Sequence, residues 1–137
     1  HRTLYNVNQR VAETYFQGRV LLAGDACHIN NPLGGMGMNG GLHDANNLGE
    51  KLVRVLRDGE PHEPLFEQYN RQRRDLAVRF VQDHTIANKK LMEATDKETQ
   101  DARQRMLMES AADPDKAKAF LLERAMINCV RDSLEVA

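Results

Sequence analysis

A short apolar run followed by a glycine-rich loop, both within Gly18–Leu48, constrains the fold of this 137-residue chain more than any other feature. The run Val20–Ala23 does not alternate with polar residues and lies between two glycines. This pattern predicts a strand buried on both faces, as in a parallel sheet. Asp25 would then lie at the carboxyl end of that strand, where open α/β sheets bind their ligands.

The glycine-rich loop is suited to close contact with a ligand. Asn30-Asn31-Pro32 predicts a turn. Gly34, Gly35 and Gly37 lack a Cβ, so the backbone there can adopt positive φ and approach a bound molecule. A helix is expected to begin near Met38–Gly41, and its first amides have no partner within the helix. The pattern therefore predicts a site for an anion, or for an atom that becomes anionic.

The same segment, GRVLLAGDACHINNPLGGMGMNGGLHDANNL, resembles the second flavin-binding motif of the single-component FAD-dependent aromatic monooxygenases related to para-hydroxybenzoate hydroxylase. Cys27 replaces the alanine usual in that motif, GRVxLxGDAAHxxxPxGGxGxNxGxxDAxNL. A weaker resemblance extends over Tyr5–Tyr15 and Tyr69–Arg74. The resemblance implies that FAD is bound by Gly24, Asp25, Pro32, Gly34, Gly35, Met36, Gly37, Met38 and Asn39.

The resemblance also implies a reaction. NADPH or NADH would reduce the FAD, and the reduced flavin with O2 would hydroxylate an aromatic, phenolic substrate. The flavin supplies this chemistry, so no catalytic side chain and no metal ligand are assigned to the chain. Two alternatives stay open. One is a related flavoprotein epoxidase, halogenase or reductase, and the other is a non-catalytic helical module that binds partners only.

A missing motif indicates that the chain is a fragment. No G-x-G-x-x-G directly follows an early strand, so the ADP-binding fingerprint is absent. We therefore expect the C-terminal part of an α/β flavoenzyme with a Rossmann-like FAD/NAD(P)-binding domain, and expect the isolated fragment to be inactive. Residues 1–60 would be the end of the FAD-binding domain and residues 61–137 a helical C-terminal region. By itself the chain should be mainly α with one or two strands.

Helical spacing of apolar residues recurs after the motif. The first helix is predicted over Asn39–Arg57 and ends at Asp58-Gly59. The second opens at Pro64 and keeps one apolar face as far as Leu91. A capping-box pattern at Thr95–Glu98 starts the third. Asp113-Pro114 starts the fourth, which is expected to run past Val130.

Composition excludes several classes of function. The net charge of −1 offers no electrostatic basis for binding nucleic acid or a membrane. The mean hydropathy of −0.62 and the lack of a long apolar run argue against a spanning helix. Two distant cysteines, Cys27 and Cys129, favour a reduced, cytoplasmic setting over a disulfide. Apolar faces left uncovered by a missing sheet predict a homo-oligomer, with contacts at Leu121, Leu122 and Met126.

The remaining polar residues have simpler interpretations. His28 is expected to form structural hydrogen bonds, because no Cys, His or carboxylate lies at metal-ligand spacing from it. Asp44 is expected to contact the helix or a neighbouring loop. His43 and His84 are expected at the surface. The cationic run Arg71–Arg74 should form a solvated or salt-bridged face.

Overall fold

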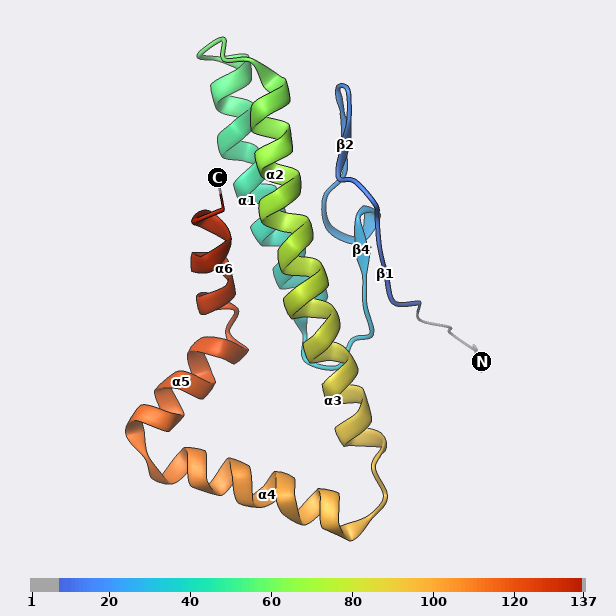
Figure 1. Cartoon of the computed structure of the whole chain (residues 1–137), viewed down its shortest axis with the longest axis vertical. Helices are drawn as coiled ribbons and strands as arrows, with labels where there is room; N and C mark the ends of the chain where they lie inside the picture. Colours follow the sequence, from blue (N-terminus) through green and yellow to red (C-terminus); the bar gives the residue numbers. More distant parts are fainter. Residues whose placement is uncertain (1–7, 137) are drawn as a thin grey trace, which may run out of the picture.

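The computed structural model describes residues 8–136, and over them the chain is mainly helical with a few short strands, as predicted (Figure 1). The strands are β1 (Arg10–Val11), β2 (Phe16–Gln17), β3 (Val20–Leu21) and β4 (His28–Ile29), with a 3-10 turn η1 (Gly24–Ala26) between the last two. The helices are α1 (Met36–Leu56), α2 (His62–Leu76), the π-helical η2 (Ala77–Gln82), α3 (Asp83–Glu93), α4 (Lys97–Ala112), α5 (Pro114–Arg124) and α6 (Ile127–Leu134). None of these helices is both long and apolar enough to cross a membrane.

The strands form two small antiparallel ladders instead of a parallel sheet. β2 pairs with β3 through a tight turn at Gly18, whose φ is 57°, and β1 pairs with β4. The prediction that Val20–Ala23 is buried on both faces is wrong for this chain, because Val20 is 66% exposed. Burial on both faces needs neighbours above and below the strand. Among the described residues, β3 has only β2 as a neighbouring strand.

Helices α1 and α2 pack against each other as an antiparallel hairpin (Figure 1). The turn between them contains Gly59, with φ 73°, as the Asp58-Gly59 signal predicted. α1 begins at Met36, earlier than predicted from the sequence. Gly37, Gly40 and Gly41 lower the helix propensity of the first turns. The sequence therefore predicts a later start of the helix than the structure has.

The second predicted helix is one continuous rod made of α2, η2 and α3, and its middle turns are π-helical. α4 begins where the capping pattern predicted, but its N-cap is Asp96, whose side chain accepts a hydrogen bond from the Thr99 amide. α5 is capped as predicted by Asp113, which accepts from the Asp115 and Lys116 amides.

The fourth predicted helix is interrupted. The chain leaves helical geometry at Met126, whose φ of 62° lies in the left-handed region, and resumes as α6. Met126 is 2% exposed and packs with Met36, Leu76 and Val81 in one core cluster. The break turns α6 back along α2 (Figure 1). Burial of one methionine therefore overrides the helical periodicity, and it also removes Met126 from the predicted oligomer contacts.

A second core cluster fixes the N-terminal strands on the α1–α2 hairpin. Its buried members are Tyr15, Cys27, Tyr69 and Ala77. The Tyr69 hydroxyl donates to the Leu22 carbonyl over 2.7 Å, which ties α2 to the end of β3. Helices α4 and α5 contribute no buried residue. The core thus lies around α1, α2 and α6, and it holds the glycine-rich loop between β4 and α1.

Candidate functional site

A cavity of about 420 Å³ lies where the glycine-rich loop enters α1. Five of the nine predicted cofactor residues line it, namely Asp25, Pro32, Gly35, Gly37 and Met38. Ile29 and Asn30, which the sequence did not single out, complete the lining. Its volume is in the range of ordinary ligand pockets and can hold part of a large cofactor.

The N-terminus of α1 opens into this cavity without a side-chain cap. Gly35 is the N-cap residue, with φ 67°, and no side chain accepts a hydrogen bond from the first helical amides. The φ of 115° at Gly34 is also in the region that favours glycine. Unpaired amides at a helix N-terminus attract negative charge. The cavity is therefore suited to the electron-rich edge of a ligand.

The other four predicted residues lie around the cavity in different settings. The Gly24 amide donates to Asp44 Oδ2 over 3.0 Å, and the Asn39 side chain donates to the Gly35 carbonyl over 3.0 Å. Gly34 borders a separate cavity on the α3–α5 side of the loop. The Met36 side chain is 2% exposed within the core, which leaves only its backbone for a cofactor contact. The assignment of all nine residues to FAD stays a prediction.

A buried polar cluster, here called the Asp44 network, lies directly behind the loop and consists of Asp44, His28 and Arg73. His28 Nε2 and Arg73 Nε each lie 2.7 Å from a different oxygen of the Asp44 carboxylate. All three side chains are at most 2% exposed. Arg73 also donates to the Gly40 carbonyl over 3.4 Å. The network therefore joins β4, the Gly24 turn, α1 and α2 at one point.

Electrostatics favour the ionised form of Asp44. Burial raises the pKa of this carboxyl, but the hydrogen bond from His28 and the positive charge of Arg73 outweigh burial and lower the pKa below its usual value. An ionised Asp44 can accept a hydrogen bond only from an N–H at His28 Nε2, which lies 2.7 Å from Oδ2. The predicted roles of His28 and Asp44 as structural partners agree with this geometry.

The sequence predicted no potential metal ligand near His28, but in the structure two such residues lie close to it. Ligand atoms of Cys27, His28 and Asp44 all lie within 4.8 Å of one another. Burial and the charge of Asp44 raise the pKa of the Cys27 thiol to about 12, so the thiol stays protonated. In this structure the three groups are engaged otherwise: the Cys27 thiol donates to Asp44 over 3.7 Å, and the Asp44 carboxylate also contacts His28 and Arg73.

The prediction of a solvated or salt-bridged face at Arg71–Arg74 holds for the ion pairs of Arg71 and Arg73, but Arg73 is buried and not at the surface. Arg73 is buried in the Asp44 network, and Arg74 Nε donates to the Ala12 carbonyl over 3.0 Å. Arg71 is exposed and lies 3.6 Å from Glu67, as expected for a surface pair. His84 is also less exposed than predicted and contacts Glu123 over 3.1 Å.

His43 departs from its predicted surface position as well. It is half-buried, and burial together with the charge of Arg73 lowers the pKa of its imidazole.

Two helical glycines that the sequence reading left unassigned allow the Gly24 turn to pack on α1. A Cβ added to Gly40 would lie 3.1 Å from His28 Cε1. A Cβ added to Gly41 would lie 3.3 Å from the Gly24 Cα. Both distances are shorter than ordinary van der Waals contact. The sequence contained a signal for this contact: glycines within a helical pattern, such as Gly40-Gly41, often mark close packing against another segment.

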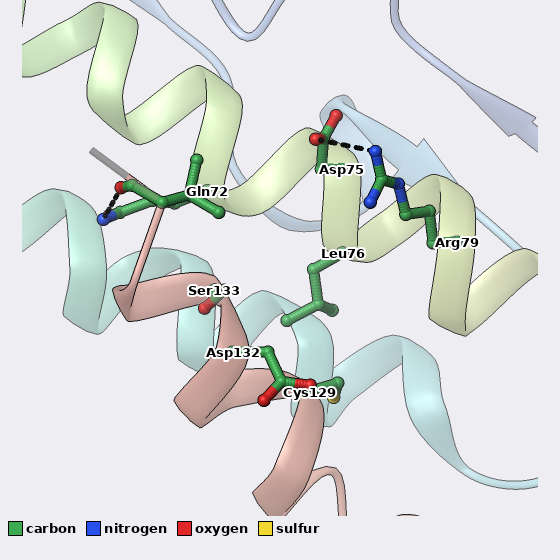
Figure 2. Close-up of a pocket in the computed structure, with 8 residues that line it drawn as sticks. Gln72, Asp75, Leu76, Arg79, Cys129, Asp132 and Ser133 are labelled. Carbon is green, nitrogen blue, oxygen red and sulfur yellow. Dashed lines mark hydrogen bonds and ion pairs between the residues drawn. The ribbon is translucent and has the colours of Figure 1, made fainter.

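A smaller cavity of about 200 Å³ separates α2 from α6 and contains none of the predicted site residues (Figure 2). Gln72 Nε2 donates to the Val136 carbonyl over 2.9 Å, which holds the end of the described chain against α2. Asp75 and Arg79 form a 3.7 Å ion pair at its edge. Burial raises the pKa of the Cys129 thiol to about 11, so this cavity offers no reactive thiolate.

Comparison with known proteins places the chain in a family. The sequence profile of the FAD binding domain family matches residues 1–84. The chain belongs to this family. The chain is 35% identical over 128 residues to para-nitrophenol 4-monooxygenase of Pseudomonas sp. strain WBC-3, covering 93% of the chain and 32% of that relative. It is 42% identical over 80 residues to pentachlorophenol 4-monooxygenase of Sphingobium chlorophenolicum, covering 58% and 15%.

Solved structures of this family agree with the fold. The chain matches the crystal structure of p-nitrophenol 4-monooxygenase PnpA from Pseudomonas putida DLL-E4 with a TM-score of 0.79 at 35% identity, over 88% of the chain and 31% of that protein. It matches K252c-soaked RebC with a TM-score of 0.60 at 29% identity, over 96% and 24%. The chain thus spans about a third or less of the relatives it matches here.

Proposed function

We propose that the chain supplies part of the flavin site of an FAD-dependent monooxygenase that hydroxylates a phenolic substrate with O2, using NADPH or NADH as reductant. One observation carries this proposal: five predicted cofactor residues gather around one cavity at the uncapped N-terminus of α1. Two of the relatives act on single-ring phenols, namely para-nitrophenol and pentachlorophenol. The cavity favours a cofactor site over the non-catalytic alternative, and these relatives favour a hydroxylase over the epoxidase, halogenase and reductase alternatives.

The chain's own groups would bind and polarise the cofactor. Asp25 is exposed and its carboxylate borders the cavity, so it can accept a hydrogen bond from a ribityl hydroxyl. The amides at Met36–Met38 lie in the first turn of α1, where they would stabilise negative charge on the edge of a reduced flavin. Bound FAD would supply hydride acceptance and oxygen activation. The protein contributes position and electrostatics.

The Asp44 network would hold this arrangement in place from behind. Its contact with the Gly24 amide fixes the turn that carries Asp25, and the Arg73 contact with the Gly40 carbonyl fixes the start of α1. Groups on rigid, hydrogen-bonded supports lose less entropy when a ligand binds. These three residues therefore act on the cofactor through the loop, as positioning residues.

The test is an FAD titration of the protein encoded by the whole gene, followed by a product assay. We expect Asp25→Ala to weaken FAD binding by about one to two decades, because a hydrogen bond to a charged acceptor is worth about 1.5–3 kcal/mol. Asp25→Asn keeps an acceptor oxygen and should lose less. Asp58→Ala removes an exposed carboxylate in the turn after α1, at the opposite end of that helix from the loop, and is the matched control.

Gly37→Val tests the approach of the backbone to the flavin. A branched side chain would enter the cavity that Gly37 lines. We expect lost hydroxylation that excess FAD does not restore, whereas excess FAD should restore most activity of Asp25→Ala. Unchanged flavin affinity in Asp25→Ala would overturn the role of that carboxylate. Full rescue of Gly37→Val by flavin would overturn the argument for the glycine loop, and a whole-gene product without flavin would favour the non-catalytic alternative.

A further inference from the structure

A second cavity lies on the other side of the glycine-rich loop and is separate from the proposed flavin pocket. Its volume is about 240 Å³, and it is bounded by α3, α4, α5 and Gly34. The two cavities share no lining residue, because Gly35, Gly37 and Met38 line the first and Gly34 lines the second.

Asn88 joins the helical wall of this cavity to the loop. Its Nδ2 donates to the Leu33 carbonyl over 3.3 Å, and its Oδ1 accepts from Arg124 Nη1 over 2.9 Å. A Cβ added to Gly34 would lie only 2.8 Å from Asn88 Nδ2, so glycine at this position permits the contact. These two hydrogen bonds connect α5 to α3 and α3 to the loop, so they fix the position of the loop at this edge of the cavity.

Most of the side chains that line the cavity are apolar. Its side chains include Leu91, Met92, Met106, Leu107 and Phe120. Met92 is 59% exposed and Met106 39%, although both are large apolar residues. Methionine side chains adapt to irregular apolar ligands and make favourable contacts with aromatic rings. The described chain leaves this apolar surface open to a ligand.

The charges of the cavity are of one sign. Arg103 and Arg124 line it, and no Asp or Glu of residues 8–136 is among its lining residues. Arg124 lies over the Phe120 ring, with its guanidinium carbon 5.3 Å from the ring centroid. Within the described part of the chain Arg103 forms no ion pair or hydrogen bond. An apolar pocket with one uncommitted guanidinium is complementary to an apolar anion.

The size of the cavity limits the ligand to one ring. An apolar protein cavity of about 150 Å³ holds benzene, so 240 Å³ accommodates one ring with small substituents. We infer that the cavity between α3, α4 and α5 is a second binding site, which takes a single-ring aromatic anion such as a phenolate or benzoate. Phe120 and the methionines would contact the ring, and Arg103 would pair with the anionic oxygen. This inference does not depend on FAD binding.

The test is a calorimetric titration of the 137-residue chain with 4-nitrophenolate, at a pH where the phenol is ionised. We expect saturable binding with one site, and at least tenfold weaker binding of nitrobenzene, which has the same ring without the anionic oxygen. Arg103→Gln should weaken 4-nitrophenolate binding about tenfold, the usual effect of losing one charge-assisted hydrogen bond. Arg105→Gln is the matched control, because Arg105 is exposed on the same helix and does not line the cavity.

A second pair of variants tests the location independently. Leu107→Glu would place a carboxylate in the cavity and should abolish binding, whereas Met108→Glu adds the same charge at a 65% exposed position outside it. Circular dichroism of each variant checks that the helices are intact. The inference is overturned if 4-nitrophenolate does not saturate, if nitrobenzene binds equally well, or if either cavity variant behaves like its control. The FAD titration of the protein encoded by the whole gene tests the proposed function separately.

Discussion

Replacing Asp44 by Asn tests whether the buried network holds the loop region together. The substitution keeps the size of the side chain and one acceptor oxygen but removes the negative charge. Arg73, at 2% exposure, would then be buried without its counterion, 2.7 Å from a neutral amide. His28 would lose the charged acceptor that also lies 2.7 Å away. The structure therefore predicts a large loss of stability from a nearly isosteric change.

The magnitude follows from the cost of an uncompensated buried charge. Breaking a buried ion pair by removing one partner costs about 3–5 kcal/mol. Small domains have total stabilities of about 5–15 kcal/mol. Because α4 and α5 bury no residue, the stability of this chain depends on the α1–α2–α6 core next to the network. We expect the loss to lower the melting temperature by roughly 10–15 °C.

The assay is urea and thermal unfolding of the 137-residue chain followed by circular dichroism. Asp58→Asn is the matched control, because it removes an exposed carboxylate that also lies 2.7 Å from an arginine. That variant should unfold at the wild-type midpoint. The double variant Asp44→Asn with Arg73→Gln should be less destabilised than the sum of the single changes, since no charge is then left buried. A loss below about 1 kcal/mol for Asp44→Asn, the scale of an exposed pair, would refute the reasoning.

Three further outcomes follow from the same structure. Since the pKa of Asp44 is lowered on folding, its stabilising contribution is present above the unfolded-state pKa of about 3.9. It is lost as the pH falls through the folded-state pKa, so wild-type stability should fall more steeply in acid than that of Asp44→Asn in pH-dependent unfolding. Cys27 is 2% exposed and its pKa is raised to about 12, so it should react with a thiol reagent only after unfolding. Half-buried Cys129 should react sooner, and equal rates for the two thiols in the folded chain would contradict this. Gly40→Ala should destabilise the fold by about 1–3 kcal/mol, because the added Cβ would lie too close to His28. Gly49→Ala is the control: it has open space around it, and alanine favours a helix more than glycine does, so no loss of stability is expected there.

Association of the chain is also open to test by light scattering. Large apolar side chains of α1 remain exposed, including Met38 at 75%, Leu42 at 62% and Leu56 at 80%. Exposed apolar surface of this kind drives association, so we expect a dimer or larger species at tens of micromolar. Leu121, at 62% exposure, stays a candidate contact, whereas Met126 is buried. A monodisperse monomer would contradict this expectation.

Local signals predicted the parts of the fold that depend on neighbouring residues. The Asp113-Pro114 cap starts α5, and the Asp58-Gly59 turn ends the first helix of the hairpin. The glycine-rich loop enters a helix next to a cavity, as its composition indicated. Caps, turns and glycine conformations are decided within a few residues of the chain, so they can be read without a tertiary structure. The division at residue 60 stays a prediction.

Contacts between distant segments could not be predicted in this way. His28 and Arg73 lie 16 and 29 residues from Asp44, and no spacing rule joins them. The helix break at Met126 contradicts local periodicity, because burial of that side chain against Met36 and Leu76 favours it. Val20 is exposed because, among the described residues, β3 pairs with β2 alone.

By itself, the sequence determined the family motif, the glycine loop before a helix and the mainly helical character of the chain. Only the tertiary structure decided that Arg73 is buried on Asp44, that α6 returns along α2 and that a cationic, apolar cavity borders Gly34. The physical reason is the range of the forces involved. Backbone conformation and capping are local, whereas burial and charge pairing depend on which distant segments exclude water from one another.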